Sequence, residues 1–177
     1  NIFYELYCQE EEKDNAEFKC CMVVNHDEQV KVYSDIAKKL GITEKYGEVV
    51  SKASTFLNRH KDLDSVDVVF IDEAHLLFTQ GNQGYSGKNQ LDDIIKRAKV
   101  VVIVFDENQI LRMDQYWEKQ MIDRYRNKAI EQQNYITLTK QLRMQADNET
   151  LAWIDAFTKK QIINKIPHHD YEIKIFD

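Results

Sequence analysis

Proline, glycine and cysteine are scarce in this sequence. One proline and five glycines occur in 177 residues, with no repeat or low-complexity tract, which excludes repeat and low-complexity architectures. The three cysteines, Cys8, Cys20 and Cys21, are odd in number and lack the spacing of metal ligands. Such cysteines indicate reduced thiols, so we expect a cytoplasmic protein.

Long hydrophobic runs and an excess of positive charge are also absent. No apolar run approaches membrane-spanning length and nothing resembles a secretory signal, so no membrane partner is expected. The formal net charge of −6 excludes a global basic surface and leaves only a local groove for nucleic acid. Hydrophobic residues make up 43% and charged residues 31%, which is typical of one ordinary globular domain.

One stretch combines a buried strand with two acids. Val66 to Ile71 ends in four consecutive large apolar residues, which predicts a strand buried on both faces of a parallel sheet. Asp72 and Glu73 follow directly, at the strand end where such sheets bind ligands. Adjacent residues there point to different sides, so one carboxylate could hold a hydrated divalent cation while the other orients or deprotonates a water.

Three other segments have the character of strands. Glu17 to Val24 is an apolar run, and Val100 to Phe105 predicts a second fully buried strand that ends at Asp106. Tyr135 to Thr139 has strong β propensity and predicts a further strand. Because helical patterns alternate with these strands, the sequence predicts a three-layer α/β domain with a mainly parallel sheet.

The expected domain spans residues 1–177, with a core at 17–144 and a C-terminal helix and edge strand at 145–177. Asn25 or Asp27 is suited to cap a helix that runs to about Leu40. Asn148 is expected to cap the last helix, and Tyr171 to Phe176 alternates as an edge strand does.

Three segments resemble helicase motifs. Ile71-Asp72-Glu73-Ala74-His75 resembles the Walker B element of P-loop NTPases in its Asp-Glu-Ala-His form. Phe105 to Gln109 resembles helicase motif III, and Gln141-Leu142-Arg143 resembles motif IV. In this order they resemble the superfamily 1 helicase motor, and most closely the ATP-binding domain of Schlafen-like DNA/RNA helicases, from about Asn1 to Phe157. The resemblance implies a RecA-like P-loop NTPase fold.

The resemblance also implies cofactors and roles, with ATP and Mg²⁺ as the bound groups. Asp72 would hold Mg²⁺ through its waters, and Glu73 would activate the attacking water. Gln109 would sense the γ-phosphate, and Arg143, with Gln141 beside it, would stabilise the transition state.

A nucleic-acid partner, DNA or RNA and most simply a single strand, follows from the same resemblance. Asn25 and His26 lie where related helicases touch the backbone, although an N-cap role also explains Asn25. Ser54 and Thr55 match a segment that faces the single strand in such motors. The alternative for that segment is a short helix that packs Phe56 and Leu57.

The phosphate-binding loop Gly-x-x-x-x-Gly-Lys-Ser/Thr is absent from the sequence, and Gly87-Lys88 lacks its spacing. We therefore expect a fragment without the first, phosphate-loop strand, which is inactive by itself. The Val100 to Phe105 strand should then pair with a substitute: Tyr135 to Thr139, the Tyr171 to Phe176 tail, or a second copy through self-association.

Two other functions remain open from the residues alone. Asp72, Glu73 and Asp106 could gather one or two cations in a metal-dependent nuclease. The chain could also be a non-catalytic module that binds nucleic acid or another partner.

Overall fold

The computed structural model describes residues 2–15, 17–81, 85–109, 116–138 and 146–159, together with 161 and 164. Its contacts divide the chain into two compact units, Asn1–Ile122 and Asp123–Asp177, and each is described by itself. Among the helices of the described residues, none has the length and apolar character needed to cross a membrane.

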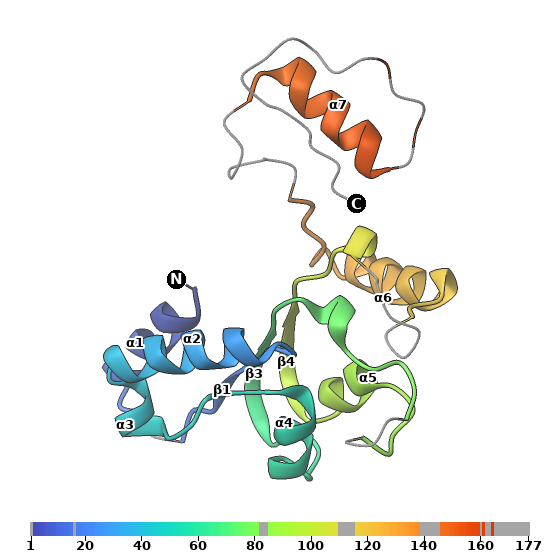
Figure 1. The fold of residues 1–177 in the computed structure, drawn as a ribbon. Coiled ribbons are helices and arrows are strands. Elements are labelled where there is room, and N and C mark those ends of the chain that lie inside the picture. Colours follow the sequence, from blue (N-terminus) through green and yellow to red (C-terminus); the bar gives the residue numbers. More distant parts are fainter. Residues whose placement is uncertain are drawn as a thin grey trace. The chain divides into compact units, whose positions relative to one another are not determined.

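The first unit is built on a four-stranded parallel sheet in the order β2-β1-β3-β4 (Figure 1). Its strands are β1 Cys20–Val23, β2 Val50–Ser51, β3 Val66–Ile71 and β4 Ala98–Ile103. The central strand β3 pairs with β1 and β4, and Val23, Ile71 and Ile103 are in register. Since these three strands end at one level, the segments that follow them leave the sheet at a common edge.

Helices alternate with the strands. The connections contain α2 Asp27–Lys39 and α3 Ile42–Tyr46 before β2, α4 Ala53–Arg59 before β3, and η1 Ala74–Leu76 and α5 Gln90–Ile95 before β4; α1 Ile2–Glu12 precedes β1. Helices α2 and α3 lie on one face of the sheet and α4 and α5 on the other (Figure 1). The expected three-layer α/β fold with a parallel sheet is confirmed.

Aromatic side chains fill the sheet face beneath α1 and α2. Tyr7 of α1 is buried, and its hydroxyl donates a hydrogen bond to the carbonyl oxygen of Cys20. The ring of Phe3 lies 5.2 Å from that of Tyr7 and 5.8 Å from that of Phe70 on β3, both edge to face. This packing joins α1 to the two central strands.

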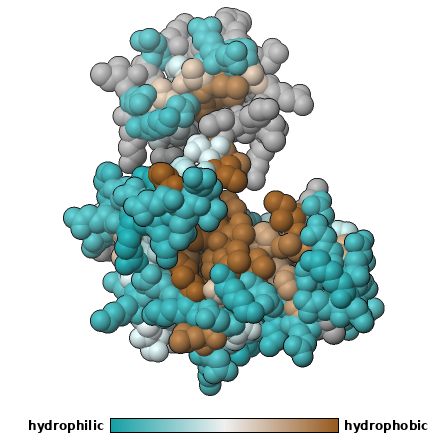
Figure 2. All heavy atoms as spheres, turned by 180° about the vertical axis from the view of Figure 1, so that it is seen from behind, coloured by the Kyte–Doolittle hydropathy of each residue, from teal (hydrophilic) through white to brown (hydrophobic). Residues whose placement is uncertain are grey.

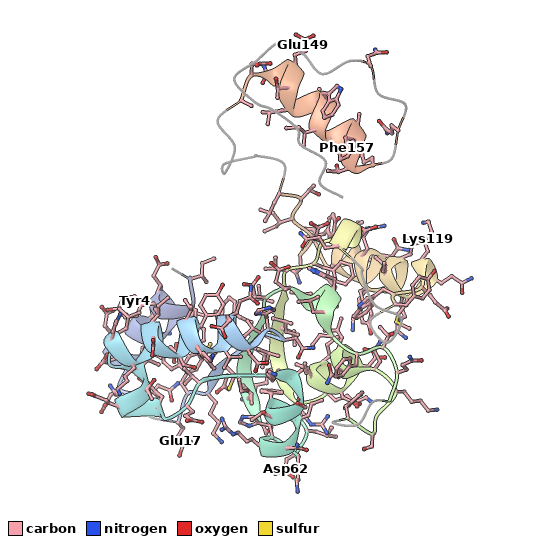
Figure 3. The ribbon with its side chains drawn as sticks, viewed as in Figure 1. Tyr4, Glu17, Asp62, Lys119, Glu149 and Phe157 are labelled. Carbon is pink, nitrogen blue, oxygen red and sulfur yellow. The ribbon has the colours of Figure 1, made fainter. Side chains whose placement is uncertain are left out.

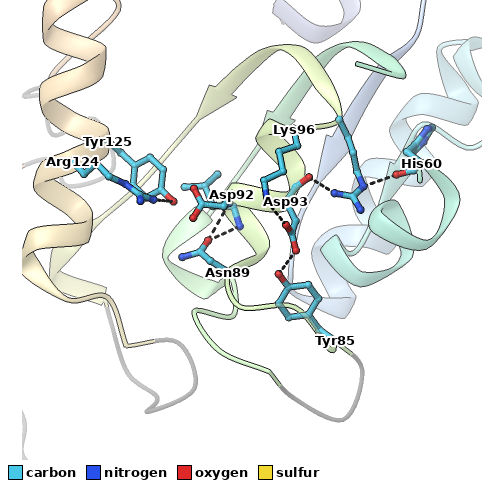
Figure 4. Close-up of polar contacts among 10 residues, drawn as sticks. His60, Tyr85, Asn89, Asp92, Asp93, Lys96, Arg124 and Tyr125 are labelled. Carbon is cyan, nitrogen blue, oxygen red and sulfur yellow. Dashed lines mark hydrogen bonds and ion pairs between the residues drawn. The ribbon is translucent and has the colours of Figure 1, made fainter. Parts of the chain in front are cut away.

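The other face is covered by short helices with buried apolar residues. Phe56 and Leu57 of α4 and Leu91 and Ile94 of α5 are all buried. Arg97 joins these two helices, because its guanidinium donates to the carbonyl oxygens of His60 and Asp93, each at 2.6 Å (Figure 4).

Strand β4 lies at the end of the strand order, so within the described residues it is an edge of the sheet. Val100 is 52% exposed, Val102 39% and Val104 47%. Hydrophobic side chains form a broad area on the molecular face seen in Figure 2. The expected burial of β4 on both faces is therefore wrong.

The predicted pairing of β4 with Tyr135 to Thr139 is also wrong for the part that is described. Residues 135–138 form no strand, and Ile136 and Leu138 are 81% and 83% exposed. Local β propensity alone therefore did not produce a strand in these residues. Thr139 and the Tyr171 to Phe176 tail lie outside the described residues.

The described part of the second unit is helical, with most of α6 Lys119–Glu131 and all of α7 Asn148–Thr158. Asp147, not the expected Asn148, is the N-cap of α7, and its carboxylate accepts from the backbone N–H groups of Glu149 and Thr150. Glu149 and Phe157 mark the two ends of this helix in Figure 3. The Phe157 ring stacks on that of Trp153 at 5.6 Å.

Candidate functional site

The acidic turn after β3 has an unusual backbone. The N–H of Asp72 still bonds to the carbonyl oxygen of Val23 on β1, whereas the N–H of Ala74 bonds to that of Val104 after β4. Between them Glu73 adopts a left-handed conformation with φ 52°. Non-glycine residues held in this region cost energy and are concentrated at functional sites. Because of this turn, the side chains of Asp72 and Glu73 leave the backbone in different directions.

Two donors fix the carboxylate of Asp72. The backbone N–H of Glu73 donates to Oδ1 at 3.1 Å, and the hydroxyl of Tyr33 on α2 donates to Oδ2 at 2.8 Å. The hydrogen bond to Asp72 and partial burial raise the pKa of Tyr33 to about 12, so this hydroxyl remains a donor at neutral pH. The Asp72 side chain is thus held in one orientation at the end of β3.

His75 links the acidic turn to the segment after β4. The ring is 2% exposed, and Nε2 lies 3.3 Å from Oε2 of Glu73. The other ring nitrogen, Nδ1, accepts from the backbone N–H of Asp106 at 3.5 Å. With Nδ1 as the acceptor, the proton of a neutral ring lies on Nε2, the nitrogen nearer to Glu73. Trp117 donates its indole N–H to the carbonyl oxygen of His75 at 3.1 Å.

Asp106 and Gln109 meet at the end of β4. The short helix η2 Glu107–Gln109 follows Asp106 directly. The Gln109 side-chain amide donates to Oδ2 of Asp106 at 2.7 Å. The His75 ring thus lies between the Glu73 carboxylate and the Asp106 backbone, and the Gln109 side chain contacts the Asp106 carboxylate.

The structure places Asn25 and His26 at the carboxyl end of β1. The Asn25 amide donates to the carbonyl oxygen of Leu76 at 2.6 Å, which joins this loop to η1. His26 is exposed and is the N-cap residue of α2, without a side-chain capping bond. The expected cap by Asn25 or Asp27 is therefore wrong, because Asn25 reaches across the sheet edge and Asp27 is the first helical residue.

Ser54 and Thr55 lie in the first turn of α4, just after β2, and both are half-buried. The short helix considered as an alternative for this segment is present, and it buries Phe56 and Leu57. Lys52, the N-cap residue of α4, forms an ion pair with Asp27 at 2.6 Å. This pair joins the loop after β2 to the first turn of α2.

The sequence-predicted site residues in the described part of the chain all follow strand ends at one edge of the sheet. They are Asn25, His26, Ser54, Thr55, Asp72, Glu73, Asp106 and Gln109. Gln141 and Arg143 lie outside the described residues. Two features were not predicted from the sequence: the contact of Tyr33 with Asp72 and the buried position of His75 between Glu73 and Asp106. No sequence signal identifies either contact, because each joins segments that are distant in the chain or depends on the turn at Glu73.

The side chains at the acidic turn suit a hydrated Mg²⁺ ion better than a metal ion that is coordinated entirely by protein groups. Nowhere in the described part of the chain do three or more His, Cys, Asp or Glu side chains form a group able to hold a metal ion. Mg²⁺ retains several waters and needs only one or two carboxylates when phosphates complete its shell. Asp72 could supply that carboxylate, since each oxygen accepts one protein hydrogen bond in the structure and has capacity for another ligand.

A parallel α/β domain with an Asp-Glu-Ala-His turn at the end of its central strand has the architecture of a helicase-type domain. The chain belongs to the Schlafen family: the model for the Schlafen group 3 DNA/RNA helicase domain matches residues 1–177. It is 33% identical over 154 residues to "Uncharacterized protein YPL245W" of Saccharomyces cerevisiae, which covers 82% of this chain. The alignment spans 33% of that relative, about a third of its length. No solved structure matches.

Proposed function

We propose that this chain is part of an ATP-dependent nucleic-acid motor, in which ATP hydrolysis is coupled to movement along DNA or RNA. The observation that carries the proposal is the series of contacts from the Glu73 carboxylate through the His75 ring to the backbone N–H of Asp106 at the carboxyl edge of the sheet. It joins the two strand ends that resemble the Walker B element and motif III. Membership of a helicase-domain family supports the same function.

Within this proposal, Asp72 would hold the hydrated Mg²⁺ of MgATP, which would supply neutralisation of the phosphate charge. Glu73 accepts a proton from the attacking water, and Nε2 of His75 orients its carboxylate from 3.3 Å away. Gln109 responds to the γ-phosphate through its side-chain amide, and its bond to Asp106 links that response to the end of β4. Gln141 and Arg143 are proposed phosphate contacts on the resemblance alone.

The nucleic-acid surface of the proposed motor lies in the loops after β1 and β2. His26 is exposed at the start of α2, and Ser54 and Thr55 lie at the start of α4. Backbone N–H groups at helix N-termini and short polar side chains suit contacts to phosphate oxygens. A single strand is the proposed ligand, and its phosphates would make binding fall steeply with added salt.

A nuclease site at Asp72, Glu73 and Asp106 is not favoured. Glu73 is engaged by His75 and Asp106 by Gln109, and no metal-binding group of three or more acidic, His or Cys side chains occurs within the described residues.

The test is Glu73→Gln in the full-length protein that contains this chain. We expect strand-stimulated ATP hydrolysis to fall by about a hundredfold or more, since the base is lost while its shape is kept. ATP affinity, measured with a fluorescent analogue, should change little. Glu48→Gln is the matched control, because Glu48 is an exposed carboxylate that pairs with Arg59. Parental turnover by Glu73→Gln would exclude Glu73 as the base.

A further inference from the structure

Tyr33 connects the aromatic core of the first unit to the acidic turn. Its ring packs against the buried cluster that contains Cys20, Val24 and Ala37. Its hydroxyl reaches Oδ2 of Asp72 at 2.8 Å, across 39 residues of sequence. A hydroxyl on a ring that is anchored in packed side chains has little freedom to leave its acceptor. The contact is therefore a fixed part of the turn.

The hydrogen bond from Tyr33 is not needed merely to give the Asp72 carboxylate a polar partner. Asp72 is half-buried, so water could hydrate its oxygens without Tyr33. The backbone N–H of Glu73 already binds Oδ1, and this bond alone leaves the second oxygen free to rotate about it. Two donors from different directions fix the plane of the carboxylate. The remaining acceptor sites on both oxygens then point in set directions.

We propose that Tyr33 is a positioning residue for Asp72, which aims the Asp72 carboxylate at the hydrated magnesium of a bound magnesium–nucleotide complex. This inference rests on the proposed ATPase function. Tyr33 itself touches neither metal nor nucleotide; it acts only through Asp72. Removal of the hydroxyl lets the carboxylate rotate, so the site loses affinity for the magnesium complex while its affinity for metal-free nucleotide is unchanged.

Binding of a fluorescent ADP analogue to the full-length protein tests the proposal, titrated with Mg²⁺ and repeated with EDTA. Tyr33→Phe keeps the ring and removes only the hydroxyl. We expect it to raise the Mg²⁺ concentration for half-maximal enhancement of binding by about tenfold, the factor that one hydrogen bond to a charged group supplies. Affinity in EDTA should match the parent.

Tyr85→Phe is the matched control. The Tyr85 hydroxyl donates to Oδ2 of Asp93 at 2.5 Å, a bond of the same kind on α5 (Figure 4). Its Mg²⁺ titration should match the parent. An unchanged titration for Tyr33→Phe would overturn the proposal, as would equal shifts in both variants, which would indicate a general loss of packing.

Asp72→Asn separates this proposal from the proposed function. If the parent shows Mg²⁺-dependent binding that Asp72→Asn abolishes but Tyr33→Phe retains in full, the positioning role is wrong and the ATP site stands. If the parent shows no Mg²⁺-dependent nucleotide binding, the proposed function and the positioning role both fail.

Discussion

The Nε2 atom of His75 lies 3.3 Å from Oε2 of Glu73, beneath a turn in which Glu73 itself is left-handed. Nδ1 of the same ring accepts from the backbone N–H of Asp106. A buried imidazole with both nitrogens engaged cannot rotate without losing one of these contacts. The Glu73 carboxylate is consequently oriented from the side of β4 as well as by its own backbone.

His75→Phe is expected to separate catalysis from binding in the full-length protein. Phenylalanine keeps a buried ring but removes the nitrogen that lies 3.3 Å from Glu73 and the acceptor for the Asp106 N–H. We expect ATP turnover to fall by about tenfold or more, because the carboxylate loses its orientation. Unfolding free energy should fall by about 1–3 kcal/mol. Steady-state kinetics and denaturant unfolding measure the two effects, and parental turnover in the folded variant would contradict the first.

Asn25 is expected to contribute to folding stability, whereas His26 is expected to contribute to nucleic-acid binding. Asn25→Ala removes the donor to the Leu76 carbonyl oxygen and should cost about 1 kcal/mol of unfolding free energy, measured with urea. His26→Ala should leave stability unchanged, because the side chain is exposed and makes no capping bond.

Binding of a labelled single-stranded oligonucleotide completes this comparison. His26→Ala should weaken binding by a few-fold, since one backbone contact is a small part of an electrostatic interface. Loss of affinity in Asn25→Ala alone, with unchanged stability, would reverse the assignment of the two residues.

The isolated 177-residue chain is expected to self-associate through β4. An exposed strand edge with apolar side chains is a template for another strand. Val102→Lys should shift the chain toward monomer in sedimentation velocity experiments, because a charge on an edge strand opposes pairing. Val32→Lys is the control, since Val32 is 55% exposed on α2, away from that edge. Equal effects of both lysines would point to net charge and not to β4.

The cysteines of β1 are expected to react slowly with alkylating reagents in the folded protein. Burial raises the pKa of Cys20 to about 12 and that of Cys21 to about 11. The thiolate is the reactive form, so at pH 8 both should react far more slowly than in the unfolded chain. Their rates should rise about tenfold per pH unit below these values. Mass spectrometry after pulsed labelling measures this, with labelling in denaturant as the control.

The central part of the fold could be predicted from sequence because its signals are local. The apolar runs of β1 and β3 and the amphipathic pattern of α2 each specify an element without reference to the rest of the chain. Strand β2 escaped prediction, since two residues, Val50 and Ser51, are too few to show a period. At residues 135–138 a strand was predicted from strong β propensity, but these residues form none, since a strand also requires a partner strand.

The candidate site divides in the same way. The shared location of Asp72, Glu73, Asp106 and Gln109 could be predicted because each follows a strand-like run, and parallel strands bring their ends together. Tyr33 and His75 were not, because their contacts depend on the direction of a ring after folding. Asn25 shows the limit most clearly: a residue typical of helix caps donates instead to a carbonyl oxygen 51 residues away.

The left-handed backbone of Glu73 places selection for stability and selection for a carboxylate in conflict at this position. Glycine enters that region freely, whereas a residue with a Cβ costs about 1–2 kcal/mol. Selection for stability alone would therefore drift toward glycine at this position, and only selection for a carboxylate would retain glutamate. Glu73 strains the turn, and the proposed chemistry requires its carboxylate. In a library of variants selected only for thermal resistance, Glu73 should therefore be replaced while the fold is kept.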